Sequence, residues 1–401
     1  MVDRLRARAE AEVLGRPLEL GCGAVLKNRL VKAAMSDSLG DGAGDPTDEQ
    51  IRLYGRWSSG GAGLSIIGEV QVDPRYPERP GNLVLGPRSD RTRLARLVQT
   101  GSRDGAHIWP QLGHAGGLAY PPLSHPAGPS ALNSDGLSCN ALSLTAIEAL
   151  PERYAAAARL AQAVGFRGVE VHAGHGFLLS QFLSPLFNRR TDRYGGGIEA
   201  RCQILVDIVR RVRRDVGPEL AIAVRVNSSD HLEGGLTEDE AITVVELIGN
   251  EAVDLIDISG GSYVPGAVAS TDRPSSGPYY LSFATRARTV TDTPLMLTGG
   301  IKTRGEASAA VGSGAVDVVG LARALALDPD LPARWLRPEG GDPEFPRFRS
   351  PPPGGVTAWY TMRLAALADH REAVFRSGPE DALADYESRD AARVAAWNEQ
   401  F

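Results

Sequence analysis

Two histidines three residues apart, His172 and His175, follow a short apolar stretch and stand directly before Gly176. Residues 168–171 have the pattern of a buried strand that delivers polar groups to the start of a loop. Two imidazole N–H groups at that place could hold a carbonyl oxygen or an oxyanion. Hydrogen-bonded structural histidines, or half of a metal site, are the alternatives that the pair alone leaves open.

The elements around this pair alternate between strands and helices. Apolar or β-branched runs predict strands at 29–34, 63–69, 107–111, 168–172, 221–226, 253–259, 294–298 and 316–320. Amphipathic segments predict helices between them, at 152–164, 198–212, 238–248 and 304–311. Such alternation predicts a parallel sheet. Eight strands favour a closed (β/α)8 TIM barrel of the α/β class, because an open doubly wound sheet would carry a Gly-rich loop after its first strand.

Two segments depart from the alternation. Residues 112–143 are rich in Gly, Pro, Ser and Asn, which predicts a long and functional loop after the third strand. Beyond Arg337 a Pro- and Gly-rich stretch leads into an Ala-rich helical tail. We therefore expect a barrel over residues 1–337 and a linker with a C-terminal helical extension over residues 338–401. The tail's apolar stripe is expected to pack on the barrel or on a sister subunit; it consists of Trp359, Tyr360, Leu364 and Leu367.

Composition excludes several classes of protein. The hydrophobic share of 42% and the charged share of 23% are those of an ordinary soluble globular chain. The net charge of −6 argues against nucleic acid as a partner, since the Arg-rich runs lie in helix-like patterns. Three scattered cysteines predict neither a disulfide framework nor a metal array. With no run long enough to span a membrane and no signal-peptide pattern, a cytoplasmic location is expected.

Glycines and basic residues follow the last two strands. Gly299, Gly300 and Lys302 follow the predicted strand 294–298, and a second group with a glycine and a basic residue ends the predicted strand 316–320. Loops at these places in a barrel, with bared backbone N–H groups and a nearby cation, are a recurring phosphate site. Simple turns are the alternative. The second group comprises Gly320, Ala322 and Arg323.

Gln111 and Arg225 end the third and fifth strands, so both would face the same mouth. An amide can donate and accept at the edge of a planar heterocycle, and a permanent cation can stabilise a reduced, anionic ring. With the phosphate loops they describe a flavin mononucleotide site better than a sugar-phosphate site. A zinc site is disfavoured, because Glu69 and Asp257 fall inside predicted strands and are expected in the polar layers of the barrel.

Four motifs occur together in order, and with them the chain resembles the Old Yellow Enzyme family of FMN-dependent NAD(P)H:flavin oxidoreductases. They are NRLVKAAM at residues 28–35, QLGHAG at 111–116, GVEVHAGHGF at 168–177, and QFLSP at 181–185 running on to NRRTDRYGG at 188–196. The resemblance spans residues 18–337. It implies FMN at the C-terminal mouth of the barrel, NADH or NADPH as electron donor, and an alkene conjugated to a carbonyl as substrate.

The resemblance also implies roles for single residues. His172 and His175 would bind the substrate carbonyl, and Gln111 and Arg225 the pyrimidine edge of the flavin. Ser36 stands where the family places a Thr or Cys that tunes the flavin potential. The phosphate would be surrounded by Gly299, Gly300, Lys302, Gly320, Ala322 and Arg323, and the flavin ring lined by Ala33, Ala34, Met35 and Ser36.

Three positions depart from the family pattern. Ala34 replaces a common Pro, with little expected effect. Val70 occupies a position that is usually small, so flavin contact there would be through backbone. Phe177 occupies the position where many family members have a Tyr that protonates the substrate carbon, and phenylalanine has no proton to give. Another donor must serve, and Tyr263, Tyr279, Tyr280 and water are the candidates. No cysteine follows Arg337, so the iron–sulfur cluster of a related branch is not expected.

The favoured hypothesis is an ene-reductase that uses FMN and acts on a small-molecule substrate. Because of Phe177, a flavin-dependent double-bond isomerase or desaturase is the alternative. A barrel that binds phosphate ligands without turnover is a non-enzyme alternative, and an aldolase using Lys302 in a Schiff base is weaker still. The physiological substrate, the choice of NADH or NADPH, and any homo-oligomer remain open at this stage.

Overall fold

The eight predicted strands are present and close into one parallel barrel in this computed structural model, which describes residues 2–134, 136–264 and 277–401. Going around the barrel, the order is β3-β4-β5-β9-β10-β11-β12-β13, and β13 pairs with β3. The predicted (β/α)8 fold is therefore confirmed. The strands are β3 (Leu30–Lys32), β4 (Leu64–Gln71), β5 (His107–Gly113), β9 (Gly168–Ala173), β10 (Ala221–Asn227), β11 (Leu255–Ser259), β12 (Leu295–Thr298) and β13 (Val318–Leu321).

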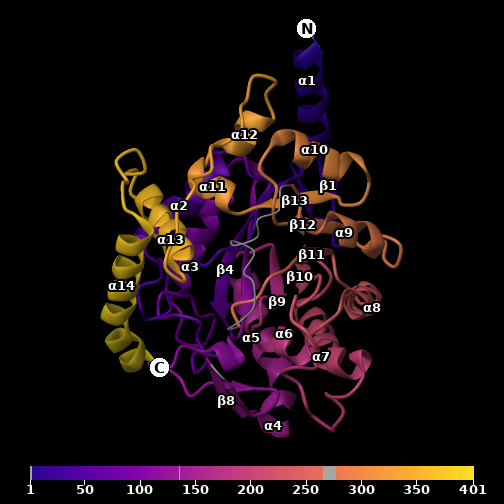
Figure 1. Ribbon diagram of the computed structural model, residues 1–401, viewed down its shortest axis with the longest axis vertical. Helices are drawn as coiled ribbons and strands as arrows, with labels where there is room; N and C mark the ends of the chain where they lie inside the picture. Colours follow the sequence, from indigo (N-terminus) through magenta and orange to yellow (C-terminus); the bar gives the residue numbers. More distant parts are fainter. Residues whose placement is uncertain (1, 135, 265–276) are drawn as a thin grey trace.

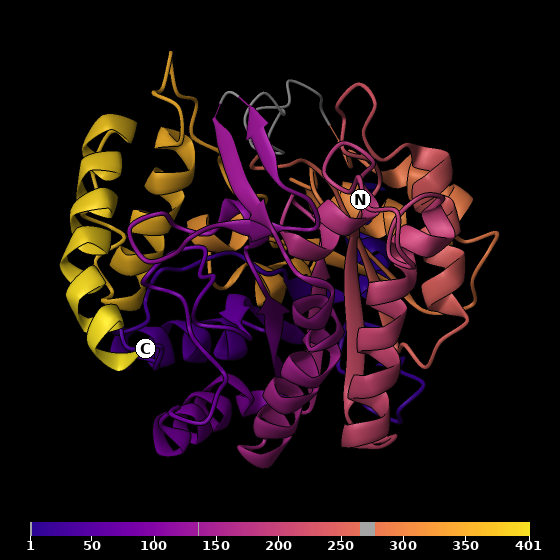
Figure 2. The same cartoon turned by 90° about the horizontal axis from the view of Figure 1, so that it is seen from below.

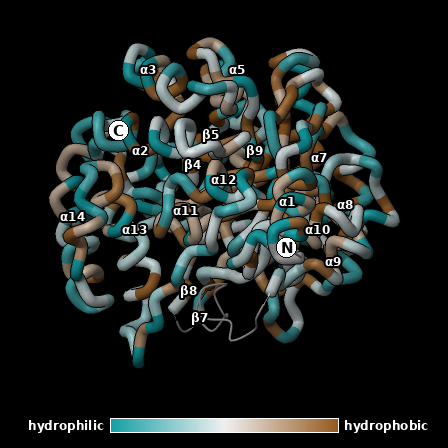
Figure 3. The backbone as a smooth tube through the Cα atoms, turned by 90° about the horizontal axis from the view of Figure 1, so that it is seen from above, coloured by the Kyte–Doolittle hydropathy of each residue, from teal (hydrophilic) through white to brown (hydrophobic). Residues whose placement is uncertain are grey.

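Helices on the outside of the barrel bury one face each (Figure 1). In α7 (Ile198–Val216), Leu205, Ile208 and Val212 recur at helical spacing and are buried. Figure 3 shows hydrophilic stretches, in teal, along outer helices such as α14. The other long barrel helices are α1 (Val2–Leu14), α2 (Asp48–Ser59), α3 (Arg91–Gly101), α5 (Leu150–Ala163), α8 (Glu238–Gly249), α9 (Leu281–Ala287) and α10 (Arg304–Gly312), and shorter ones are α4 (Leu144–Glu148), α6 (Leu178–Leu183), α11 (Arg323–Leu327) and α12 (Leu331–Trp335).

A small hairpin closes the N-terminal end of the barrel. Strands β1 (Leu18–Glu19) and β2 (Val25–Leu26) pair antiparallel. Leu20 and Leu26 pack there on residues from the first halves of the barrel strands, including Leu64 and Trp109. Because this end is filled with apolar side chains, ligands have access only at the opposite, C-terminal mouth.

The segment 112–143, predicted as a long loop, contains secondary structure of its own. It contains the 3₁₀ turn η2 (Gly116–Leu118) and a three-stranded sheet in the order β6-β8-β7. In β8, Leu137 and Cys139 are buried and alternate with exposed residues, a period of two that the Ser and Asn content hides. The strands are β6 (Ala127–Gly128), β7 (Leu132–Ser134) and β8 (Leu137–Ala141).

The C-terminal tail packs on the barrel of its own chain. It forms two helices, α13 (Gly355–Ala368) and α14 (Pro379–Gln400), which stand side by side as a yellow layer at one flank of the barrel (Figure 2). Tyr360, Leu364 and Leu367 of the predicted apolar stripe are buried in the main core. Arg56 of α2 donates to the carbonyl of Leu367 at 2.9 Å, so the tail is also fixed by hydrogen bonds.

Candidate functional site

The carboxyl ends of the barrel strands surround a cavity of about 330 Å³. Loops after the strands form most of its wall, and the two tail helices complete it. Most of the predicted site residues line this cavity, so the structure brings them together: Ala34, Met35, Ser36, Gln111, His175, Phe177, Arg225, Gly299, Gly300, Lys302, Gly320, Ala322 and Arg323.

Three predicted residues lie behind the cavity wall. The side chains of Ala33 and Val70 are fully buried, and Val70 belongs to the main core. A ligand could therefore meet these two residues only through their backbone. His172 is also buried, and it reaches the site through Glu69, which does line the cavity.

The glycine turn after β12 has a geometry that only glycine fits. Gly299 and Gly300 have φ values of 134° and 80°. A Cβ on Gly300 would come within 2.1 Å of the carbonyl oxygen of Gly277. The turn brings bare backbone, the Lys302 ammonium and the Arg323 guanidinium to one end of the cavity. This arrangement fits a phosphate group.

One part of the expected phosphate cradle is already occupied. The backbone N–H groups of Lys302 and Thr303 both donate to Glu306 Oε2, at 2.8 and 3.0 Å. Glu306 thereby completes the capping box of α10 with Thr303. The start of α10 is thus closed to an anion by its own cap, and the side chains of Lys302 and Arg323 must supply the charge.

Removing either cation is expected to weaken FMN binding. A hydrogen bond to a charged group contributes about 1.5–3 kcal/mol, so Lys302→Ala and Arg323→Ala should each raise the Kd for FMN by roughly 10- to 100-fold. Fluorescence quenching of FMN on titration measures this Kd. Arg96→Ala is the matched control, because Arg96 is an exposed cation paired with Asp48 on the barrel exterior. An unchanged Kd in both cavity variants would place the phosphate elsewhere.

A buried charge network stands at the other end of the cavity. Arg225 forms an ion pair with Asp257, and its Nε lies 3.7 Å from Glu170 Oε1. Gln111 Nε2 donates to the same Glu170 oxygen at 2.7 Å. Arg225 Nη2 is the atom that contacts Asp257, and Arg225 Nη1 donates to the carbonyl of Ala34 at 3.5 Å, so protein groups fix the guanidinium at the cavity wall. A fixed cation at this place fits the pyrimidine edge of a flavin, because it can stabilise negative charge on a reduced ring.

The histidine pair consists of neutral imidazoles. His172 Nδ1 accepts from the backbone N–H of Gly174 at 3.3 Å, so the proton of the neutral ring is on Nε2, which lies 3.2 Å from Glu69 Oε1. His175 Nε2 lies 3.0 Å from Ser259 Oγ. Burial, and then the charge of Arg225, lower the pKa of His172 well below its ordinary value. The same burial, with His172 and Arg225 nearby, lowers the pKa of His175.

Glu69 lies inside β4, as its predicted place in a strand requires, and it also lines the cavity. The pairing of β4 with β5 shifts register between Ile67 and Val70, and Glu69 has a φ of 54°. This bulge turns the carboxyl to the cavity, where Glu69 is 6% exposed. Its Oε2 has no hydrogen-bond partner among residues 2–134, 136–264 and 277–401. Burial raises the pKa of Glu69 to about 8.

The raised pKa of Glu69 predicts a pH-dependent stability. The uncharged carboxyl stabilises the folded state fully below the ordinary pKa of 4.5, and this contribution is lost as the pH rises through about 8. Glu69→Gln, which does not titrate, should therefore gain melting temperature relative to the parent between about pH 5 and about pH 9. Glu12→Gln on α1, where the side chain is 63% exposed, is the control. A constant difference across this range would show that Glu69 stays charged.

Ser36 is part of a polar cluster that the sequence did not reveal. Its hydroxyl donates to Glu78 Oε2 at 3.2 Å, and Asn82 Nδ2 donates to Ser36 Oγ at 3.2 Å. Glu78 and Arg79 line the cavity and come from the segment PRYPERP that follows β4. Two opposite charges set among prolines were the available sequence signal for an ordered functional loop.

The tail helices form part of the cavity wall. Tyr360 and Thr361 come from α13, and Tyr386 and Glu387 from α14. Helix α14 is held in place by hydrogen bonds to the barrel loops, where Arg389 and Arg393 each donate to the carbonyl of Ser38 at 2.8 Å. Trp397 donates to the carbonyl of Pro74 at 3.1 Å. The extension is therefore a structural part of the site.

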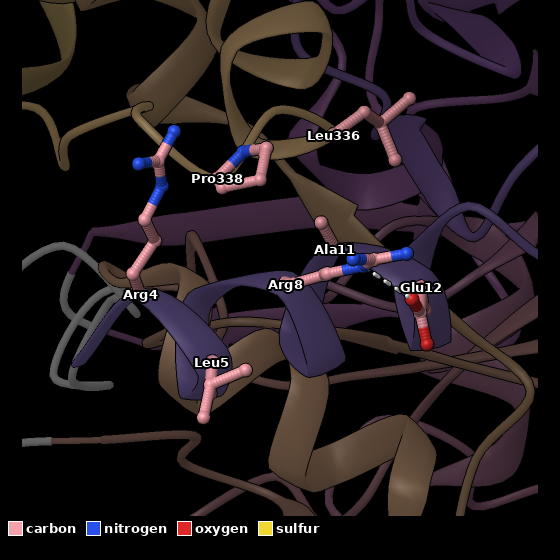
Figure 4. A pocket seen from close by; sticks show the side chains of 7 residues that line it. All are labelled: Arg4, Leu5, Arg8, Ala11, Glu12, Leu336 and Pro338. Atoms are coloured by element: carbon pink, nitrogen blue, oxygen red, sulfur yellow. Dashed lines mark hydrogen bonds and ion pairs between the residues drawn. The ribbon is translucent and has the colours of Figure 1, made fainter. Parts of the chain in front are cut away.

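A second cavity, of about 580 Å³, lies outside the barrel between α1 and the residues after α12 (Figure 4). Arg4 and Arg8 line it, and their charges are satisfied by Glu339 at 3.2 Å and Glu12 at 3.1 Å. It contains no group suited to catalysis among its lining residues. Among the described residues, no three or more His, Cys, Asp or Glu side chains form a cluster that could hold a metal. The same residues include no helix that is long and apolar enough to cross a membrane.

Known proteins share this fold and sequence. The model of the NADH:flavin oxidoreductase / NADH oxidase family matches residues 14–337. The chain is 37% identical over 352 residues to NADH-dependent flavin oxidoreductase iliE of Hypocrea jecorina (strain QM6a), covering 79% of this chain and 87% of the relative.

Solved structures of Old Yellow Enzyme family members resemble the fold of this chain. Morphinone reductase in complex with tetrahydroNAD superposes with a TM-score of 0.71 at 25% identity, covering 83% of this chain and 93% of that one. The old yellow enzyme homologue from Zymomonas mobilis gives a TM-score of 0.71 at 25% identity, with coverage of 83% and 94%. The chain therefore belongs to the NADH:flavin oxidoreductase / NADH oxidase family, in its Old Yellow Enzyme group, and is an oxidoreductase that uses FMN and NAD(P)H.

Proposed function

We propose that this enzyme reduces the activated C=C bond of an α,β-unsaturated carbonyl compound with electrons from NAD(P)H. The observation that carries the proposal is a pair of neutral histidines, with His175 in the cavity wall and His172 buried directly behind it. His175 lines the cavity, and the His172 ring lies 5.0 Å from the His175 ring. Neutral N–H groups in a buried site can stabilise the negative charge that develops on a carbonyl oxygen during reduction.

The cofactor-binding residues are assigned by the same reasoning. Lys302 and Arg323 would hold the phosphate, and Gln111 and Arg225 the pyrimidine edge, with Met35 and Ser36 beside the ring. FMN bound there supplies a hydride that originates from NAD(P)H. The protein itself orients the carbonyl through His172 and His175, excludes water with the tail helices, and delivers a proton to carbon.

Anaerobic reduction in two steps tests the proposal. NADH or NADPH should bleach the flavin absorbance, and addition of an enone such as cyclohexenone should restore it and yield the saturated ketone. Gas chromatography with mass detection identifies the product. If the reduced flavin is reoxidised by oxygen or quinone but by none of a panel of enones, the enone reductase proposal fails while the flavin oxidoreductase stands.

A double-bond isomerase or desaturase is a second candidate, and the position of Phe177 favours it. Phe177 is 2% exposed and packs on Ala115 and Ala119, so a side chain without a proton fills the usual donor position. Without prompt protonation, a reduced substrate can return its hydride. Comparing enone turnover by the parent and by Phe177→Tyr separates the two: a parent as fast as the variant removes the reason for this second candidate.

A further inference from the structure

We propose that Tyr263 supplies the proton that Phe177 cannot, which makes Tyr263 the catalytic acid of this enzyme. The inference rests on the proposed enone reduction. It begins with a chemical need, because hydride addition to the β-carbon leaves an enolate whose α-carbon must accept a proton. Phe177 has no titratable atom, so a second side chain has to reach the same part of the cavity.

Tyr263 is placed beside Phe177 by the loop that follows β11. Its backbone N–H donates to the carbonyl of His175 at 3.1 Å, which fixes the loop to the histidine segment. The ring of Tyr263 lies 5.8 Å from the ring of Phe177 and 6.1 Å from the ring of His175. Tyr263 also lines the cavity. A phenol therefore stands between the expected carbonyl-binding histidine and the residue at the usual donor position.

The other tyrosines near the mouth lie elsewhere. Tyr279 and Tyr280, both considered from sequence, pack against Gly299 and Gly300 at the phosphate end, and neither is among the described residues that line the cavity. The Tyr360 ring lies under Arg323, 5.9 Å from its guanidinium carbon. Tyr263 is thus the tyrosine whose ring lies close to the rings of both His175 and Phe177.

Tyr386 is the remaining cavity tyrosine, and it comes from α14. The guanidinium carbon of Arg79 lies 5.5 Å from its ring. No contact between Tyr386 and the rings of His175 or Phe177 occurs in the part of the chain that the structure describes. The matched control for Tyr263 is Tyr194, whose hydroxyl donates to Asp207 of α7 at 3.3 Å and which is not among the residues that line the cavity.

The exposure of Tyr263 explains how the acid is regenerated. The residue is 55% exposed, whereas Phe177 is 2% exposed. In the reduction of the enone, the β-carbon gains a hydride and the α-carbon gains the Tyr263 hydroxyl proton. The Tyr263 phenolate then regains a proton from water. The sum is one NAD(P)H and one solvent proton consumed for each C=C bond reduced.

Tyr263→Phe in the flavin-loaded enzyme tests the inference, with the two half-reactions measured separately by stopped-flow absorbance. Flavin reduction by NADH should stay within about twofold of the parent. Reoxidation by cyclohexenone should slow by roughly 10²- to 10⁴-fold, the usual contribution of a general acid. Reoxidation by benzoquinone, which needs no proton on carbon, should not change. Tyr194→Phe should behave as the parent in all three measurements.

Two further measurements separate proton donation from binding and folding. The Kd of para-hydroxybenzaldehyde, a carbonyl ligand that is not reduced, should be the same for the parent and Tyr263→Phe. The double variant Tyr263→Phe/Phe177→Tyr should regain most of the lost rate, because it restores a phenol to the neighbouring position. A Tyr263→Phe enzyme as fast as the parent, or an equal loss in Tyr194→Phe, overturns the inference. A parent that reduces no enone overturns the proposed function and this inference together.

Discussion

Replacement of both His172 and His175 by alanine is expected to lower kcat/KM for cyclohexenone by roughly 10²- to 10³-fold or more, since loss of a single oxyanion donor already has an effect of that size. The loss should appear in the oxidation of the flavin by the enone. FMN content should be unaffected, because the Lys302 and Arg323 cations that would hold the phosphate are unchanged. Steady-state kinetics and flavin absorbance measure the two quantities.

Asparagine variants are the controls for this prediction. His172→Asn and His175→Asn each retain an N–H donor and should recover part of the lost rate. The pH profile gives a second check: burial lowers the pKa of both histidines, so the donors stay neutral and the rate should show no histidine titration between about pH 8 and about pH 6. A rate that is unchanged in the double alanine variant would remove the histidines from carbonyl binding.

Arg225→Met is expected to lower the free energy of unfolding by about 3–5 kcal/mol, because it leaves buried carboxylates without their cation. Asp257 and Glu170 are both 0% exposed, and Arg225 is the cation that contacts them. The variant should also be purified with little FMN, since it lacks the guanidinium that lines the cavity. Urea denaturation and the flavin-to-protein absorbance ratio test the two effects.

A compensated variant distinguishes these two roles of Arg225. Adding Glu170→Gln and Asp257→Asn to Arg225→Met removes the unpaired charges, so most of the stability should return while FMN binding should not. If FMN content returns together with stability, the arginine acts on the flavin only through the fold. An unfolding free energy within about 1 kcal/mol of the parent for Arg225→Met alone would show that the carboxyls are protonated in the folded state.

The barrel could be predicted from sequence because its signals are local. Each strand is a short apolar run followed by a helix with an apolar stripe, and the ends of the strands meet at one mouth by the rules of the fold. Because Gln111 and Arg225 each end a predicted strand, the sequence predicted that both lie at the same mouth of the barrel. The place of Glu69 in a strand was predicted in the same way, but its part in the site depends on a register shift in β4, for which Gly68 inside the strand was the local signal.

The remaining site residues depend on contacts distant in sequence. Glu78 lines the cavity and accepts a hydrogen bond from Ser36, which is distant in sequence. Tyr386 lines the cavity because α14 packs on the barrel loops. The apolar stripe of the tail predicted that the tail packs on another surface, but it left open whether that surface belongs to the barrel or to a sister subunit. Among the tyrosines considered as donors, sequence left all three equal, and only the bond from Tyr263 to His175 separates Tyr263 from the other two.

Transfer of deuterium from NADH labelled at both C4 positions tests the central claim most directly. In an anaerobic reaction of the flavin-loaded enzyme with cyclohexenone, the saturated ketone should carry one deuterium at the β-carbon and none at the α-carbon, because the hydride originates from the nicotinamide and the proton from solvent. Mass spectrometry and proton NMR of the product locate the label. Recovery of unchanged enone, or of a saturated ketone without label at the β-carbon, would contradict enone reduction by this site.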